Sequence, residues 1–173
     1  MNPLKGRPVS LRPLVEGDAE DLLDAVNSSR QALKRRLSWV SAISSTEDCR
    51  AFIRQSEAFA VIEAKDPGML IGSASLQAAP ILPGLAEASV WIRSDRSGRG
   101  YATQALLLLE ARAFRQDALH KLYARIDPAN RPGRKVLQKA GFGYEGCLRR
   151  EKCLNGRWVD QECWGLLREE WKK

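Results

Sequence analysis

Apolar residues follow two kinds of spacing along the chain, and these divide it into predicted strands and helices. Alternation of apolar and polar side chains, rich in β-branched and aromatic residues, is typical of strands. It occurs over 9–15, 58–64, 69–79, 85–93, 121–127, 142–150 and 156–167. Apolar residues three or four positions apart predict helices instead. They occur in the segments 18–26, 32–40, 45–53, 102–113 and 131–141.

Capping and turn residues support this division. Two pairs have the spacing of a capping box at a helix start, namely Asp18 with Asp21 and Ser45 with Asp48. Gly141 has the place of a helix C-cap, and KDPG between two strands predicts a turn in an antiparallel hairpin. We therefore predict one α+β domain over residues 1–173, with a mixed, mostly antiparallel seven-stranded sheet flanked by four to five helices.

Composition is that of an ordinary globular protein, with 44% hydrophobic and 28% charged residues. The longest apolar run, ALLLLEA, is far shorter than the roughly 20 residues of a membrane-spanning helix. The start MNPLKGRP lacks the apolar segment of a secretion signal. Four cysteines show neither C-x-x-C spacing nor the density of a disulfide framework. We expect a cytoplasmic protein without a membrane interaction.

The formal net charge of +7 favours anionic partners. The basic runs RQALKRRL and CLRREK are not interleaved with the aromatic residues on which single-stranded nucleic acid stacks. Direct nucleic-acid binding is therefore the weaker alternative, although the charge would favour proximity to a ribosome. His120 is the only histidine and has no neighbouring cysteine in a metal-binding spacing, so we expect no metal site.

The stretch SGRGYA, residues 97–102, joins a predicted strand to a predicted helix. Gly98 and Gly100 permit positive φ angles or close approach of a ligand, and a helix N-terminus exposes backbone N–H groups. This arrangement is typical of a phosphate site. A P-loop motif is absent, and a dinucleotide fingerprint would need glycine where Thr103 stands. Taken alone, the two glycines also fit a tight turn that binds nothing.

Longer motifs give the loop a context. RSDRSGRGYATQALLLL after LAEASVWI, then DPANRPGRKVLQKAGF, YEGCLRR and NGRWVDQ, closely resemble the GNAT superfamily of acetyl-CoA-dependent N-acetyltransferases, in particular its RimJ/RimL-like branch. The resemblance covers nearly the whole chain. It implies that strand 85–93 splays away from strand 121–127, that the pantetheine arm of the co-substrate pairs with the exposed strand edge, and that an oxyanion is bound by backbone near Val90, Trp91 and Ile92.

The resemblance also assigns residues to acetyl-CoA. These are Trp91, Ile92, Arg93, Arg96, Ser97, Gly98, Arg99, Gly100, Tyr101, Ala102, Thr103, Asn130, Gly133, Arg134 and Lys135. Asn130 would bind the pantetheine arm, unless it only caps a turn, and Arg131, Arg134 and Lys135 are candidates for the 3′-phosphate. The family's loop begins with Gln or Arg where this chain has Asp95, which matters little because main-chain groups make the contacts.

Three side chains that relatives use in catalysis are replaced. Members that acetylate ribosomal-protein N-termini often carry Ser and Glu where this chain has Gly133 and Lys152, and other members carry Tyr where it has Leu137. Glu87 is our leading candidate for the base, against the alternative of an outward-facing strand charge. Glu151 and Tyr144 are further candidates.

The resemblance places Trp39, Glu87 and Lys152 along the acceptor groove. An acyl-enzyme on Cys147 or Cys153 is a minor alternative, because neither cysteine has a local histidine partner. We expect direct attack in a ternary complex instead.

The pKa of the acceptor amine decides how strong a base the enzyme must supply. An α-amine has a pKa of roughly 7.7–8.0 and a lysine about 10.4, so an α-amine tolerates a weaker base. We therefore expect the N-terminal α-amine of a protein or peptide as acceptor, with the enzyme a monomer or homodimer. The alternatives are a small-molecule amine, such as an amino acid, polyamine or antibiotic, and a CoA-binding module with little catalysis.

Overall fold

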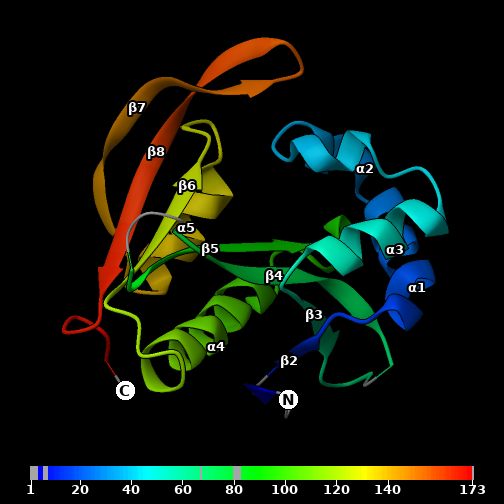
Figure 1. The fold of residues 1–173 in the computed structure, drawn as a ribbon, viewed down its shortest axis with the longest axis horizontal. Helices are drawn as coiled ribbons and strands as arrows, with labels where there is room; N and C mark the ends of the chain where they lie inside the picture. The colour runs from blue at the N-terminus through cyan, green and yellow to red at the C-terminus, as the bar shows by residue number, and fades with distance from the viewer. Residues whose placement is uncertain (1–3, 6–7, 67, 80–82, 173) are drawn as a thin grey trace.

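The computed structural model describes residues 4–5, 8–66, 68–79 and 83–172, which form an eight-stranded sheet covered by helices (Figure 1). The strands are β1 Leu4–Lys5, β2 Val9–Pro13, β3 Ala58–Glu63, β4 Leu70–Ala78, β5 Leu85–Ile92, β6 Lys121–Ile126, β7 Gly143–Leu154 and β8 Arg157–Leu167. The α-helices are α1 Ala19–Asn27, α2 Arg30–Lys34, α3 Thr46–Gln55, α4 Tyr101–Arg115 and α5 Arg131–Lys139. Shorter 3₁₀ helices occupy Glu16–Asp18, Ser38–Ser41 and Ser94–Arg96.

The strands lie in the order β1-β2-β3-β4-β5-β6-β8-β7. Among the described strands, β5 and β6 run parallel and every other neighbouring pair is antiparallel. The predicted mixed, mostly antiparallel sheet is thus confirmed. Its seven predicted strands are β2 to β8, and the two-residue β1, which the sequence pattern did not predict, pairs with β2 at the edge.

The middle of the sheet is covered on both faces. Every residue of β3 is buried, and its side chains alternate between two hydrophobic clusters. Phe59 and Val61 join the cluster beneath α4, whereas Ala60 and Ile62 join the cluster beneath α1 and α3. Strands buried on both faces are stabilised mainly by the apolar area that they remove from water.

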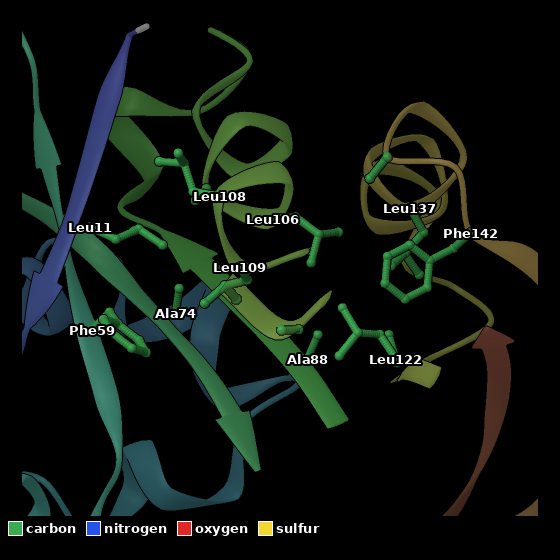
Figure 2. Packing of buried hydrophobic residues seen from close by; sticks show 14 of the residues in the cluster. Leu11, Phe59, Ala74, Ala88, Leu106, Leu108, Leu109, Leu122, Leu137 and Phe142 are labelled. Carbon is green, nitrogen blue, oxygen red and sulfur yellow. The ribbon is translucent and has the colours of Figure 1, made fainter. Parts of the chain in front are cut away.

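Helices α4 and α5 cover one face of the sheet. Figure 2 shows Leu109 of α4 next to Ala74 of β4, and Phe142 next to Leu137 and Leu122. All five residues belong to one buried cluster. Because α4 is packed against the sheet, its N-terminus is held at the end of β5, where the glycine loop lies.

One of the two predicted capping boxes forms. Asp48 donates its backbone N–H to Ser45 Oγ at 3.1 Å, and the Asp48 carboxylate accepts from the Ser45 N–H at 2.8 Å. The box predicted at Asp18 does not form. Its carboxylate accepts instead from the guanidinium of Arg12 at 2.6 and 2.7 Å and from the Val15 N–H at 2.9 Å, so it does not cap the helix.

The helix predicted over 32–40 is broken into two pieces. Helix α2 ends at Lys34, and a 3₁₀ helix follows at Ser38–Ser41. The guanidinium of Arg30 donates to the carbonyl groups of Val40 and Ile43 at 3.1 and 2.7 Å. These two bonds hold the chain in a turn that a continuous helix does not allow.

Strands β5 and β6 separate after a short paired stretch. Their register joins Leu85, Ala86 and Glu87 to the residues from Lys121 to Tyr123, and no pairing follows between the two described strands. The splay implied by the family resemblance is therefore present. It leaves one edge of β5 open beyond Glu87, directly before the glycine loop.

Candidate functional site

A cavity of about 690 Å³ opens where β5 and β6 separate. Its walls come from α2, β5, the loop before α4, the first turn of α4, β6, α5 and the β7–β8 hairpin. The expected site residues that line it are Glu87, Val90, Trp91, Ile92, Arg96, Ser97, Gly98, Gly100, Tyr101, Ala102, Thr103, Asn130, Gly133, Lys135 and Lys152. Within the described part of the chain, the expected residues outside the lining are Trp39, Arg93, Arg99, Arg131, Arg134 and Tyr144.

The glycine loop beside this cavity has a row of backbone amides without protein partners in the described part of the chain. Across the described residues, no backbone N–H from 98 to 103 donates to a protein acceptor. Gly98 and Gly100 have φ angles of +78° and +80°, which L side chains rarely adopt. A Cβ at either position would meet nothing within 4 Å. The backbone angle, rather than crowding, is therefore what requires glycine here.

A buried carboxylate holds both ends of this loop. Glu63, at the end of β3, is 7% exposed and accepts hydrogen bonds from the Tyr101 hydroxyl and from Arg96 Nε, the latter at 3.2 Å. The Tyr101 and Arg96 contacts hold the pKa of the Glu63 carboxyl below its usual value. Sequence reasoning missed Glu63, because its partners lie 38 and 33 residues away. An acidic residue ending an otherwise apolar strand was the available signal.

Two of the arginines expected to bind acetyl-CoA are engaged elsewhere. Arg93 donates to Asp24 at 2.9 Å and to Asp95 at 2.8 Å. Arg134 forms a two-pronged pair with the buried Glu162 at 2.8 and 2.5 Å. A guanidinium that donates from two nitrogens to carboxylates has few N–H donors free to bind a phosphate. The placement of Arg134 and Arg93 thus argues against the roles expected from the sequence.

Asn130 caps α5 and still has a free donor. Its Oδ1 accepts from the Gly133 N–H at 3.1 Å, and Nδ2 has no acceptor among the described residues. A Cβ built on Gly133 would lie 2.5 Å from this Nδ2. The two alternatives considered for Asn130, turn cap and ligand donor, are therefore compatible. The clash also explains why position 133 suits glycine while Asn130 keeps this orientation.

The open edge of β5 has a defined set of backbone groups. Arg93 donates its N–H to Ile71 O of β4 at 2.8 Å, and the β4–β5 register is continuous through Trp91. Backbone groups of successive strand residues point to opposite edges. The N–H groups of Val90 and Ile92 therefore face the gap toward β6, whereas that of Trp91 faces β4.

Glu87 lies at the last paired position before the gap and is half-buried. Burial raises the pKa of its carboxyl, an effect that Arg125 and Lys152 partly oppose. The nearest Arg125 nitrogen is 3.9 Å from Glu87 Oε2. Glu151 also lines the cavity, whereas Tyr144 is exposed on β7 and outside the lining. Of the three carboxylic or phenolic candidates, Glu87 has the environment most suited to a base near neutral pH.

Comparison with known proteins decides the family. The sequence model of the family described as "Acetyltransferase (GNAT) domain" matches residues 9–143. The chain belongs to the GNAT acetyltransferase family. It is similar to the "Probable N-acetyltransferase YjcK" of Bacillus subtilis (strain 168), at 29% identity over 95% of this chain and 96% of that protein. It is also similar to the ribosomal-protein-serine acetyltransferase of Escherichia coli (strain K12), at 23% identity over 88% of each chain.

Solved GNAT structures have the same fold. Mycobacterium smegmatis RimJ in complex with CoA-disulfide superposes with a TM-score of 0.84, at 26% identity, over 99% of this chain and 88% of that one. The recognition of a RimJ/RimL-like GNAT acetyltransferase from sequence motifs is thus confirmed.

Other expected site residues of this GNAT chain lie away from the cavity. Trp39 stacks on Phe52 at 4.7 Å and leans on Trp91 at 6.0 Å between ring centroids, so it packs behind the wall that Trp91 forms. Cys147 and Cys153 are exposed and outside the lining. Neither cysteine is placed where a cavity-bound acyl group would reach it.

Two features are absent from the described residues. No group of three or more His, Cys, Asp or Glu side chains gathers where it could hold a metal ion. No helix in this part of the chain combines the length and apolar character needed to cross a membrane.

Proposed function

We propose that this GNAT acetyltransferase transfers the acetyl group of acetyl-CoA to the N-terminal α-amine of a peptide or protein by direct attack in a ternary complex. The observation that carries the proposal is the row of unpartnered amides from 98 to 103 at one end of a cavity whose other end holds Glu87. A helix N-terminus of this kind binds phosphate groups, and a half-buried carboxylate accepts protons.

The residues of the cavity fit the parts of the co-substrate. The amides of 98–103 would bind the diphosphate, and Lys135 is placed to pair with a further phosphate. Asn130 Nδ2 and the free edge of β5 would bind the pantetheine amides, as an added strand would be bound. Arg96 contributes by holding the loop through Glu63 rather than by binding phosphate itself.

The chemistry needs few side chains. The amine nitrogen attacks the thioester carbon, the oxyanion forms near the Val90 or Ile92 N–H, and the carbon–sulfur bond breaks. Glu87 takes the proton that the amine loses, directly or through water. The thiolate leaves as such or takes a proton from solvent, because its pKa of about 8.5 makes it an adequate leaving group.

A carboxylate base such as Glu87 favours an α-amine over a lysine side chain as acceptor. At neutral pH a lysine side chain costs on the order of 3.5 kcal/mol more than an α-amine to present without its proton. Cations near the cavity, among them Arg125 and Lys152, further disfavour an acceptor that carries several positive charges, such as a polyamine.

The test is acetyl-CoA calorimetry combined with an acceptor screen scored by CoA release. We expect binding of acetyl-CoA, and transfer to peptides with a free N-terminus but not to the same peptides carrying a blocked N-terminus and an internal lysine. Binding without transfer to any amine would indicate a CoA-binding module. Antibiotics or polyamines exceeding every peptide would refute the proposed acceptor.

A further inference from the structure

Two segments rich in basic residues meet beside the cavity, and each contributes one cation, Arg36 or Lys152, to its lining. The segments are the end of α2 with the residues after it, and the β7–β8 hairpin. Their basic residues, here called the basic mouth, are Lys34, Arg35, Arg36, Arg149, Arg150, Lys152 and Arg157. Across the described residues, none of them lies within 4.0 Å of a carboxylate in an ion pair.

The two segments meet across the opening. Lys152 Nζ donates to the carbonyl oxygen of Arg36 at 3.1 Å, and Asn155 Nδ2 donates to that of Lys34 at 3.3 Å. In Figure 1 the orange β7–β8 hairpin accordingly arches toward α2 at the upper edge of the molecule. Arg36 and Lys152 line the cavity itself, so the basic mouth continues from its interior to its rim.

Acidic groups near the opening do not cancel this charge. Asp160 accepts from the backbone N–H of Arg150 at 2.8 Å, and Glu87 interacts with Arg125, at 3.9 Å, as well as with Lys152. Glu151 and Asp127 are the further carboxylates of the lining, and Asp127 accepts from the Ala129 N–H at 2.7 Å. Elsewhere in the chain, by contrast, arginines such as Arg93 and Arg134 are paired with carboxylates. The basic mouth therefore has an excess of exposed positive charge at one place.

The β7–β8 hairpin is irregular where its basic residues lie. Residues 149–151 stand opposite no partner in the β7–β8 register, and Arg150 has a φ of +51°, the left-handed region that a branched or long side chain rarely adopts. This irregularity inserts two arginines and Glu151 into the hairpin directly before Lys152.

We propose that the basic mouth binds acidic residues that follow the N-terminal amine of a peptide acceptor. The inference rests on the proposed function, since it assumes that an amine enters this cavity beside Glu87. A peptide fits better than a free amino acid, because a single α-carboxylate would reach the lining cations but not those of the rim. Single exposed charge pairs contribute little, so several cations together are needed to select a partner.

The test uses three peptides that differ only at positions two to four. Each begins with serine and ends in the same neutral segment; the variable positions are Asp-Glu-Asp, Asn-Gln-Asn or Lys-Lys-Lys. We expect kcat/KM, measured by CoA release, to be at least about tenfold higher for the acidic than for the neutral peptide at low salt, and lowest for the basic one. The advantage should shrink at high ionic strength, because salt screens exposed charges.

Charge-neutralising variants locate the effect. Arg36→Gln, Arg150→Gln and Lys152→Gln should each lower the ratio of acidic to neutral kcat/KM by about two- to fivefold, mainly through KM. Lys65→Gln, which removes an exposed cation in the turn between β3 and β4, is the matched control and should leave the ratio unchanged. An equal loss in Lys65→Gln would mean that net charge, rather than the basic mouth, selects the acceptor, and would overturn the proposal.

Failure of this inference is distinguishable from failure of the proposed function. Equal rates on the three peptides would overturn the acidic preference while leaving N-terminal transfer in place. Free aspartate or serine acetylated more efficiently than the acidic peptide would overturn the peptide acceptor. Acetyl-CoA binding without transfer to any of them would overturn the proposed function itself.

Discussion

Glu110 lies on the buried side of α4, and the pH dependence of stability should reveal it. Glu110 is 1% exposed, and its Oε1 has no hydrogen-bond partner among the described residues. Burial raises the pKa of its carboxyl to about 8, although a hydrogen bond from Trp171 opposes the rise. Glu110 therefore remains protonated at neutral pH in the folded protein, whereas in the unfolded chain it ionises near its ordinary pKa of 4.5.

The sign of the effect follows from proton binding. Between pH 4.5 and about 8 the folded state holds a proton that the unfolded state releases, so the free energy of unfolding falls as pH rises through this range. The slope reaches roughly 1.4 kcal/mol per pH unit, and the full loss has an upper value of roughly 5 kcal/mol. Below pH 4.5 the residue contributes no pH dependence.

Glu110→Gln removes this dependence. The amide adds a buried donor that must find a partner, which costs about 1–3 kcal/mol, so the variant should be less stable than the natural protein near pH 5. It should become the more stable of the two at about pH 8 to 9. Urea unfolding at pH 5, 7 and 9, with the exposed Glu20→Gln as control, measures both curves. Parallel curves for the natural protein and Glu110→Gln would refute the assignment of a protonated Glu110.

Three further predictions concern the site. Gly100→Ala should weaken acetyl-CoA binding by up to about tenfold, because alanine at φ +80° costs about 1–2 kcal/mol. Gly17→Ala, at a glycine without a positive φ and with equal room for a Cβ, is the calorimetric control. Glu87→Gln should lower kcat and remove the acidic limb from the pH profile of kcat. Because the pKa of Glu87 is raised, this limb should lie above pH 4.5 in the natural protein, and an unchanged profile would exclude Glu87 as the base. Glu63→Gln should raise the Kd for acetyl-CoA with little change in kcat, as should Tyr101→Phe to a smaller extent. Unchanged affinity in both variants would mean that the loop keeps its shape without the buried carboxylate.

Local patterns explain most of what was predicted correctly. The capping box at Ser45 joins groups three residues apart, and the strand pattern of 85–93 followed by SGRGYA correctly predicted a strand, a glycine loop and a helix start in succession. The positive φ angles of Gly98 and Gly100 likewise follow from their neighbours in the chain. Such features depend on short-range geometry, so the order of residues is sufficient to find them.

The ion-pair partners of charged side chains were harder to predict. Arg134 has the position of a phosphate ligand in the motif, yet Glu162, 28 residues away, takes both prongs of its guanidinium. Asp18 has the position of a helix cap, yet Arg12 takes its carboxylate. A charged group binds whichever opposite charge the fold brings nearest, and a linear motif does not contain that distance.

The amino-acid sequence by itself determined the family, the succession of strands and helices, and the glycine loop between β5 and α4. Only the tertiary structure decided that Glu63 holds that loop, that Trp39 packs behind the cavity instead of lining it, and that cations from α2 and the β7–β8 hairpin share one opening. The physical reason is one of range. Backbone conformation responds to neighbours a few residues away, whereas burial and charge pairing respond to segments that only folding brings into contact.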